Sequence, residues 1–322
     1  MKKLLLKLTV FLVPLRSFIT CTFLFEGGFS DAYYLRLTTP KQQSLVVGTS
    51  RAAQGIMPTV LNKMLSGHYT HPVFNYAFTV THSPYGKAYF KSIKNKLDTT
   101  VRDGLFIVTV DPWSLSASRK ENETHVFEEQ NTFMGGVANV SANPNLDYLL
   151  NYYGEPFYTI ISDRFFPRPM HLHEDGWLQV TVAMDSNSVA KRKTQQLREY
   201  TKKAKELQFS DGRLDFLEKT LGYLKGHGDV FLVRLPVSRE MLQVENSLKA
   251  DFNSSMQSLA SRYAIPFLDM TQSCNDCIFN DGHHLNQKSS PEVTAYIAEQ
   301  ILSKENFKRD LMVGQNTVGN IE

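Results

Sequence analysis

The sequence predicts an α/β protein with three layers, in which helices cover both faces of a five-stranded, mainly parallel sheet. Short apolar runs rich in β-branched residues alternate with longer amphipathic segments, and this alternation is typical of parallel sheets. The clearest run, residues 104–110, is almost continuously apolar, as expected for a central strand buried on both faces. One large domain accounts for the 322 residues, of which 42% are apolar and 21% charged.

The strands are expected at residues 45–47, 73–77, 104–110, 229–235 and 265–268. Helices are expected directly after Ser50, at 83–97, 189–225 and 240–263, and from Ser290 to about Leu302. Pro84 and Pro291 are compatible with these assignments, because proline is tolerated in the first turn of a helix. Residues 306–322 are interpreted as a flexible tail.

Residues 1–25 have the pattern of a signal anchor. Lys2 and Lys3 precede a mostly apolar stretch, which is typical of an export signal or a membrane anchor. An uncleaved anchor is favoured, because no Ala-x-Ala cleavage site follows. Arg16 makes a transmembrane helix marginal, since a charge near the centre of a bilayer costs about 2.5–3.5 kcal/mol. An amphipathic or buried helix is the alternative, because the uncharged runs are short.

Residues 26–43 are interpreted as a polar stalk that leads into the main domain at 44–305. Within that domain, residues 114–187 are rich in Asn, Phe, Tyr, Pro and His and contain turn signals such as Asp175-Gly176. This segment is too long for a plain loop in a compact domain. We therefore expect an insertion or lid that shapes substrate access.

The expected partners follow from charge and from the N-terminal segment. A net charge of +3 gives no indication of a nucleic-acid partner. If residues 1–25 are an anchor, the membrane is a partner and the domain lies in the bacterial cell envelope, outside the cytoplasm. No cofactor or metal is expected, because His171-Leu172-His173-Glu174 lacks a spaced partner cluster.

A pair of cysteines, Cys274 and Cys277, precedes the last predicted helix. A lone Cys-x-x-Cys is weak evidence for zinc. A thioredoxin-type redox site is disfavoured, because no strand runs straight into the motif at a helix start. In an exported domain, a small disulfide is more consistent with the oxidising compartment.

The segment Ser44–Pro58 contains the first candidate catalytic residue. The apolar run stops at Gly48 and a helical pattern begins after Ser50, so Ser50 lies between the end of a buried strand and the start of a helix. A serine there can be a nucleophile, and its own N–H can serve an oxyanion hole. The same residues also fit an ordinary helix cap by Thr49 or Ser50.

The motif Asn280–Asn286 contains the other two groups that a serine hydrolase needs. His284 can take the proton of Ser50, and Asp281, three residues earlier, can hold the imidazole in the required tautomer. His283 is a competing base, but the Asp-x-x-His spacing favours His284.

Gly48-Thr49-Ser50 and Asp281-x-x-His284-Leu285 resemble the first and last blocks of the SGNH/GDSL hydrolases, including the membrane-anchored branch with DltD and alginate-type O-acetyltransferase proteins. The similarity spans roughly Ser44–Leu302, and the two motifs carry most of it. It implies a flavodoxin-like fold and a Ser-His-Asp triad that acts on an O-acyl ester of an envelope or extracellular polysaccharide. The sequence leaves open whether water or a sugar hydroxyl receives the acyl group.

The middle blocks depart from the family pattern. Where the family usually has a glycine and Gly-x-Asn-Asp to complete the oxyanion hole, this chain has Asn75-Tyr76-Ala77 and Asp111-Pro112-Trp113. Ala77 can still donate a backbone N–H, and either Asn75 or the Trp113 indole is a candidate for the missing donor. Losing one such donor typically costs on the order of 100-fold or more in rate.

Three of the candidate residues follow predicted strands, at the edge where ligands bind in open α/β sheets. Asp111 is either a substrate-binding carboxylate or a cap of the strand end. Trp113 is either a wall of the site or a core residue. Arg234 either binds an anionic substrate group or pairs with Glu240 or Glu245.

These observations favour a serine-dependent acyl-ester hydrolase or O-acyl(acetyl)transferase that acts on an acylated saccharide or cell-envelope polymer. The alternative is a carbohydrate-binding or scaffold protein of an envelope polysaccharide assembly that keeps the fold but is a weakened catalyst. A redox or metal protein built on the cysteines and histidines is a third possibility.

Overall fold

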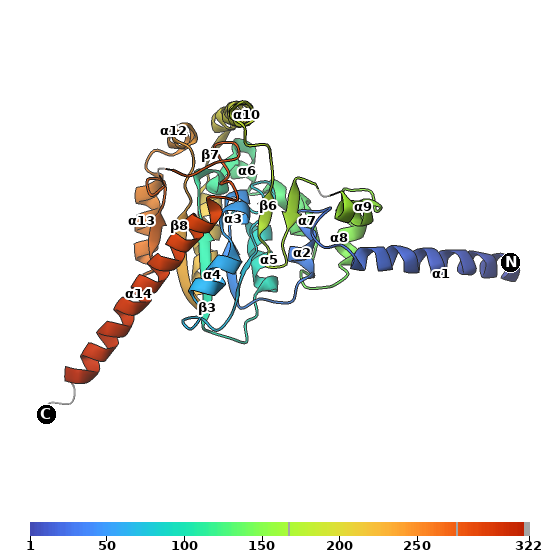
Figure 1. Cartoon of the computed structure of the whole chain (residues 1–322), viewed down its shortest axis with the longest axis horizontal. Coiled ribbons are helices and arrows are strands. Elements are labelled where there is room, and N and C mark those ends of the chain that lie inside the picture. The colour runs from blue at the N-terminus through green and yellow to red at the C-terminus, as the bar shows by residue number, and fades with distance from the viewer. Residues whose placement is uncertain (167, 275, 319–322) are drawn as a thin grey trace.

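The computed structural model describes residues 1–166, 168–274 and 276–318 and contains a five-stranded sheet in which all neighbouring strands are parallel (Figure 1). The strand order is β2-β1-β3-β8-β9. The strands are β1 (Ser44–Val47), β2 (Val73–Asn75), β3 (Gly104–Thr109), β8 (Gly228–Arg234) and β9 (Phe267–Asp269). The predicted fold class and all five predicted strands are confirmed, with small shifts at the strand ends.

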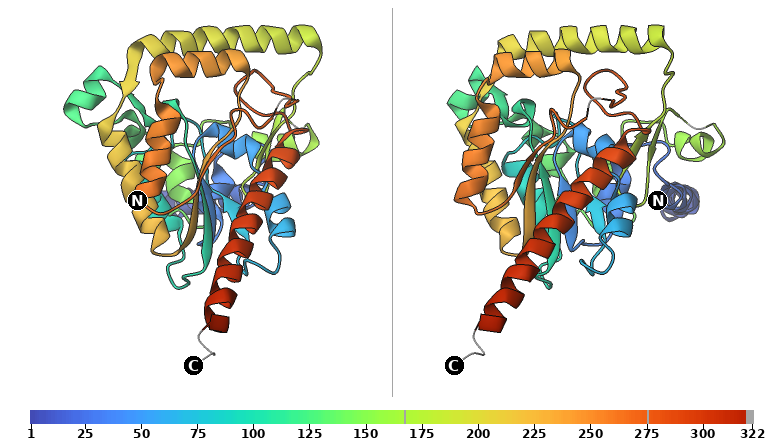
Figure 2. Two further views of the ribbon diagram at one scale, coloured as in Figure 1. Left: turned by 90° about the vertical axis from the view of Figure 1, so that its left-hand side faces the viewer. Right: turned by 60° about the vertical axis from the view of Figure 1, so that its left-hand side comes forward.

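Helices cover both faces of the sheet, as the continuous apolar runs predict. Neighbouring side chains of β1 point to opposite layers: Val47 packs on one side and Val46 on the other. The first layer is formed mainly by α5 (Lys87–Lys96), α11 (Asp211–Lys225) and α13 (Phe252–Arg262). The second is formed by α3 (Ser50–Gly55), α4 (Pro58–Met64) and α14 (Ser290–Val318), and Figure 2 shows α14 running along that face.

The carboxyl end of β1 lies at the point where the strand order reverses. From β1 the chain passes outward to β2 and then returns to β3 on the other side. Ligands of open α/β sheets bind at such a point. Gly48, directly after β1, has a φ of +150°, and a Cβ built there would lie only 1.8 Å from Oγ1 of Thr109. This turn therefore requires glycine.

Residues 26–43 are not a stalk, and this prediction is wrong. They contain the buried helix α2 (Tyr34–Thr38), and Arg36 within it is fully buried. Its guanidinium donates hydrogen bonds to the backbone oxygens of Ala32, Asn75 and Gly176. Hydrogen bonds to backbone carbonyl groups thus compensate for burying the Arg36 charge. A prediction from composition places such a charged residue at the surface.

Residues Lys2–Leu24 form helix α1, which extends away from the body of the protein (Figure 1). In the described part of the chain, no helix combines the length and the hydrophobicity needed to cross a bilayer. The expected membrane-spanning anchor is therefore not supported, since Lys7 and Arg16 interrupt the apolar stretch.

The predicted insertion, 114–187, is made of short elements that pack partly into the core. They are the 3-10 helices Pro112–Leu115 and Glu128–Asn131, β4 (Ser116–Ser118), α6 (Arg119–Thr124), α7 (Phe133–Gly136), α8 (Leu146–Asn151), α9 (Thr159–Phe165), β5 (Met170–Leu172) and β6 (Leu178–Val180). Phe133 and Tyr148 contribute to the core beneath them.

Both long predicted helical regions are interrupted, and the last helix is longer than expected. The first region divides into α10 (Ser186–Glu206) and α11, separated by β7 (Leu207–Phe209), which pairs with β4. The second divides into α12 (Arg239–Leu248) and α13. Helix α14 continues to Val318 instead of ending near Leu302. The last four residues of the predicted tail, 319–322, lie outside the described residues.

Candidate active site

Ser50 begins helix α3 directly after the turn that ends β1. Its side chain does not cap its own helix: Oγ lies 2.8 Å from Nε2 of His284. Thr49 precedes the helix, but its hydroxyl donates to Oδ2 of Asp111 at 3.1 Å. The Ser50 N–H lies in the first turn, where backbone donors have no helical carbonyl partner.

Asp281 and His284 lie in the loop between β9 and α14, as their spacing predicts. His284 Nδ1 donates to Oδ2 of Asp281 at 2.8 Å. Oδ1 of Asp281 accepts the backbone N–H groups of His283 and His284 at 2.9 and 2.8 Å. With Nδ1 as the donor, Nε2 of a neutral imidazole is free to accept the Ser50 hydroxyl proton.

Burial raises the pKa of Asp281, but the hydrogen bonds from His284 and from the two backbone N–H groups outweigh this effect and hold its pKa below the usual range. The carboxylate is therefore ionised at neutral pH. The side chains of His284 and Asp281 remain 13% and 16% exposed, so the pair is in contact with solvent.

The loop that carries these two residues, 278–286, which we call the base loop, is held by three separate elements. Arg192 of α10 donates to the carbonyl oxygen of Asn280 at 2.9 Å. The backbone N–H of Ser238, which caps α12, donates to the carbonyl oxygen of Gly282 at 2.9 Å. Arg51 of α3 contacts His283, as described below.

Asn75 does not lie free to bind an oxyanion, which corrects the expectation from the sequence. Its side-chain amide is fully buried and donates to the backbone oxygens of Ala52 and Ile56 at 2.8 and 2.9 Å. Its Oδ1 accepts the Ala77 N–H at 3.1 Å. The Ala77 donor is thus already engaged, and Asn75 fixes the turn after β2 instead of facing a substrate.

Trp113, Asp111 and Arg234 also have structural partners. The Trp113 indole donates to Oε1 of Glu245 at 3.0 Å, so it is not an oxyanion donor. Asp111 caps the following 3-10 helix by accepting the Ser114 N–H at 2.8 Å. Arg234 is buried and pairs with Oε2 of Glu245 at 2.7 Å. Arg234 and Asp111 thus make the structural contacts that the sequence offers as alternatives: an ion pair with Glu245 and the cap of a 3-10 helix.

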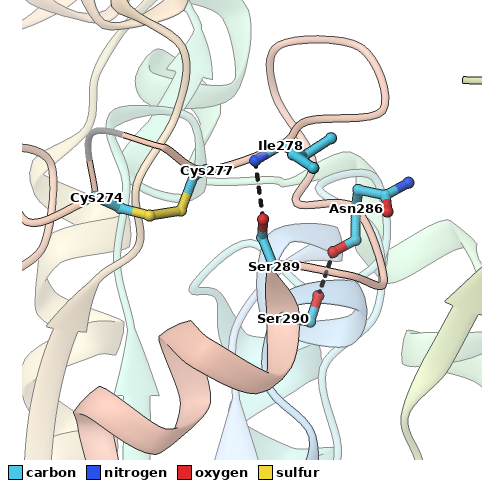
Figure 3. The surroundings of a disulfide bond; sticks show 6 residues. All are labelled: Cys274, Cys277, Ile278, Asn286, Ser289 and Ser290. Atoms are coloured by element: carbon cyan, nitrogen blue, oxygen red, sulfur yellow. Dashed lines mark hydrogen bonds between the residues drawn. A yellow bond between two sulfur atoms is a disulfide. The ribbon is translucent and has the colours of Figure 1, made fainter. Parts of the chain in front are cut away.

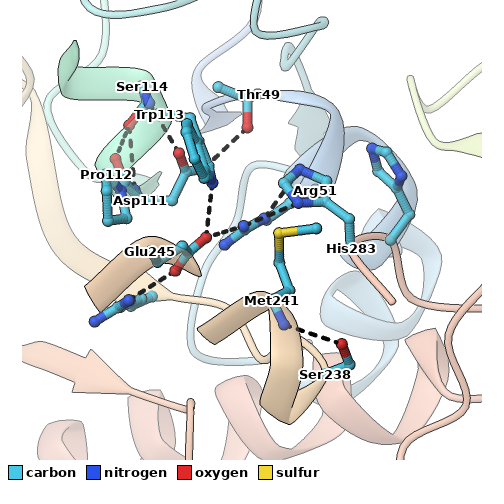
Figure 4. Close-up of polar contacts among 12 residues, drawn as sticks. Thr49, Arg51, Asp111, Pro112, Trp113, Ser114, Ser238, Met241, Glu245 and His283 are labelled. Carbon is cyan, nitrogen blue, oxygen red and sulfur yellow. Dashed lines mark hydrogen bonds and ion pairs between the residues drawn. The ribbon is translucent and has the colours of Figure 1, made fainter. Parts of the chain in front are cut away.

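Glu245 of α12 is the centre of a buried cluster that the sequence does not indicate as a unit (Figure 4). It accepts from Arg51, Arg234 and Trp113 and is fully buried. Burial raises its pKa, but the two guanidinium groups have the larger effect and lower it. The sequence signal that points toward this cluster is the possible pairing of Arg234 with Glu245.

His283 is buried between this cluster and the base. Its ring lies 4.4 Å from that of Tyr200 and 4.6 Å from that of His284, measured between centroids. Arg51 Nε donates to Nε2 of His283 at 3.3 Å. Burial and the adjacent Arg51 charge lower the pKa of His283 well below its usual value, so the ring is neutral. The hydrogen bond of Ser50 is made to His284 and not to His283.

A cavity of about 320 Å³ lies next to Trp113 and Tyr200. Val80, Thr81, Trp113, Tyr200 and Lys203 contribute to its lining. Tyr200 also packs against His283 with the two rings tilted by 32°, so this cavity adjoins the base loop. Trp113 is thus a wall residue of this cavity, although its side chain is almost fully buried.

Cys274 and Cys277 form a disulfide with a Cα–Cα distance of 5.5 Å, just before the base loop (Figure 3). The loop has its own hydrogen bonds beyond the disulfide: Ile278 N–H donates to Oγ of Ser289 at 2.9 Å, and Asn286 N–H donates to the Ile278 carbonyl at 2.8 Å. Among the described residues, no three His, Cys, Asp or Glu side chains are grouped closely enough to hold a metal ion.

Comparisons with known proteins give distant structural similarity alone. No family model and no curated protein match the chain. Similar solved structures include the native aryl esterase of M. Smegmatis, with 11% identity and a TM-score of 0.37, and its inhibitor-bound form, with 12% identity and a TM-score of 0.36. Est24, a carbohydrate acetylesterase from Sinorhizobium meliloti, has 10% identity and a TM-score of 0.36. In each case 81% of this chain and 99% of the other chain are covered.

Proposed function

We propose that this chain is a serine-dependent acyl-ester hydrolase or O-acyltransferase of the SGNH type. The observation that carries the proposal is the hydrogen-bonded series from Ser50 Oγ through His284 to Asp281, with both contacts at 2.8 Å. Nucleophile and base lie within hydrogen-bonding distance, and a carboxylate orients the base, which is the arrangement that activates a serine hydroxyl.

In the proposed reaction, His284 Nε2 takes the proton of Ser50 as Oγ attacks the ester carbonyl carbon. The imidazolium that forms is stabilised by the Asp281 carboxylate. Collapse of the tetrahedral intermediate breaks the bond to the leaving alcohol, which receives the proton from His284. Water or a sugar hydroxyl then attacks the acyl-serine and gives its proton to His284. Collapse of this second intermediate breaks the bond between Ser50 Oγ and the acyl carbon, His284 returns the proton to Ser50, and the acid or the acylated sugar is released. The identity of the attacking hydroxyl separates hydrolysis from transfer.

The oxyanion is stabilised by the Ser50 N–H, and Ala77 can add a second donor if it releases its bond to Asn75. We therefore propose a slow catalyst or one that completes its oxyanion hole on substrate binding. A carbohydrate-binding or scaffold protein with an ineffective site is the competing proposal, and the engaged Ala77 N–H is the observation that favours it.

The proposed substrate is an O-acyl ester on an envelope or extracellular polysaccharide, and this part rests on the resemblance of the two motifs. We also propose that residues 1–25 associate with a membrane and that the main domain lies outside the cytoplasm. Two features support this association. Helix α1 presents exposed Leu, Val and Phe side chains, and Tyr158, Phe165 and Phe166 at the ends of the adjacent α9 are more than two-thirds exposed.

A fluorophosphonate probe, which reacts only with an activated serine, tests the catalytic proposal. The full-length chain should label, and both Ser50→Ala and His284→Ala should abolish labelling. Ser66→Ala, which removes the hydroxyl of an exposed serine shortly after α4, is the matched control and should label like the wild type. No labelling of a folded wild-type chain would support the scaffold alternative.

A further inference from the structure

We infer that Arg51 and His283 are positioning residues: Arg51, anchored by Glu245, holds His283 in place and thereby fixes the base loop so that His284 faces Ser50. This inference rests on the proposed function, because it assigns the groups that keep the proposed nucleophile and base aligned. It adds two residues beyond the three that are proposed to carry out the reaction.

The position of Arg51 in the chain is the first argument. It directly follows Ser50 in α3, and its guanidinium contacts His283, which directly precedes His284. One side chain thus connects the segment of the nucleophile with the segment of the base, although 232 positions separate Arg51 from His283. Its side chain is 3% exposed, so water does not compete for these contacts.

The anchoring of Arg51 is the second argument. Nη2 of Arg51 pairs with Oε1 of Glu245, whose other oxygen pairs with Arg234 and which also accepts from Trp113 (Figure 4). A guanidinium held by a buried, hydrogen-bonded carboxylate has few alternative rotamers. Arg51 therefore contacts His283 with a side chain held in one conformation.

The environment of His283 is the third argument. The ring of Tyr200 in α10 packs against the His283 ring at a tilt, and the His284 ring meets it edge-on. Because the ring is neutral and buried, one nitrogen can accept from Arg51 without a competing protonation at neutral pH. A displacement of His283 would carry His284 with it, since the two residues are consecutive and their rings are in contact.

Paired substitutions at His283 test the inference in the full-length chain. His283→Phe keeps a flat ring against Tyr200 but cannot accept from Arg51, whereas His283→Gln keeps an acceptor. With p-nitrophenyl acetate as the substrate, we expect His283→Phe to lower kcat at least tenfold with KM unchanged within about twofold, and His283→Gln to recover much of the loss. Arg51→Lys, which keeps the charge but not the planar fork, should show the same kcat effect.

A spectroscopic measurement separates positioning from a loss of stability. The low-field proton resonance of the His284–Asp281 hydrogen bond should broaden or disappear in His283→Phe and persist in His283→Gln. A folded His283→Phe variant with wild-type kcat and an unchanged resonance would overturn the inference while the proposed function stands. Should His283→Phe not fold, Arg51→Lys alone decides by the same two readouts. A folded wild type that neither labels nor hydrolyses the ester would overturn both proposals.

Discussion

Ser50 Oγ and His284 Nε2 lie 2.8 Å apart, although 234 positions of the sequence separate the two residues. Ser50 follows the strand at the reversal point of the sheet, and His284 belongs to the loop that enters the last helix. The sheet thus brings together two segments that lie far apart in the sequence. The base loop then orients the imidazole of His284.

Replacing Asp281 by Asn should reduce kcat by about 10³–10⁴-fold for a small ester, because the amide cannot hold His284 in the required tautomer or stabilise the imidazolium. Steady-state kinetics of Asp281→Asn beside the wild type provide the measurement. Asp185→Asn alters an exposed helix cap on α10 and serves as the control, with activity expected to stay within about twofold. Equal kcat values for Asp281→Asn and the wild type would remove Asp281 from the mechanism.

Asn75→Ala should lower the free energy of unfolding by about 2–4 kcal/mol, because the buried carbonyl groups of Ala52 and Ile56 lose their donor. Urea unfolding of the purified protein measures this change. Asn151→Ala, on the exposed side of α8, should change stability by no more than about 0.5 kcal/mol. A small effect at Asn75 would mean that the turn after β2 relaxes to satisfy those carbonyls in another way.

The protein should lose stability as the pH falls below about 6.5, the ordinary pKa of histidine. The pKa of His283 is lowered in the folded state, so below about pH 6.5 the unfolded chain binds a proton that the folded chain does not, and unfolding becomes more favourable as pH decreases. Titration of His283 changes the free energy of unfolding by at most about 1.4 kcal/mol per pH unit.

Urea unfolding of the wild type and His283→Phe at pH 5 and 7 tests this pH dependence. The variant should show a shallower decline, whereas His68→Gln, at an exposed histidine, should decline like the wild type. Identical slopes for His283→Phe and the wild type would contradict the assignment of a neutral, buried His283.

Removing the disulfide with Cys274→Ser and Cys277→Ser should cost about 2 kcal/mol or less, because the loop that the bond closes is short. Fluorophosphonate labelling should persist, since Arg192 and Ser238 hold the base loop by other hydrogen bonds. The unfolding midpoint and the labelling rate of the double variant are the two measurements. Loss of labelling in a folded double variant would show that the disulfide itself positions the loop.

The sequence predicts the strands well, because a short, continuous apolar run such as 104–110, rich in β-branched residues, is typical of a strand buried on both faces. It also identifies Ser50, Asp281 and His284 as candidates, since each belongs to a short motif with a defined spacing. The structure brings these three side chains into hydrogen-bonding contact.

Other contacts could not be predicted, because they join segments that only the folded sheet brings together. Arg51, Glu245 and His283 come from three separate segments, and no local pattern links them. Asn75 is a candidate oxyanion donor by its position, but the sequence does not reveal that its amide satisfies two buried carbonyls. The same holds for Arg36 in the expected stalk, since burial of a charge depends on tertiary partners.

The long separation between Ser50 and His284 also has a consequence for biosynthesis. In a nascent chain, Ser50 is synthesised 234 positions before His284. Until then the serine has neither its base nor the orienting carboxylate, so an incomplete chain, or one cut before residue 281, cannot form the proposed acyl-enzyme. Ester cleavage would therefore indicate that the chain has been synthesised beyond His284 and has folded so that His284 contacts Ser50.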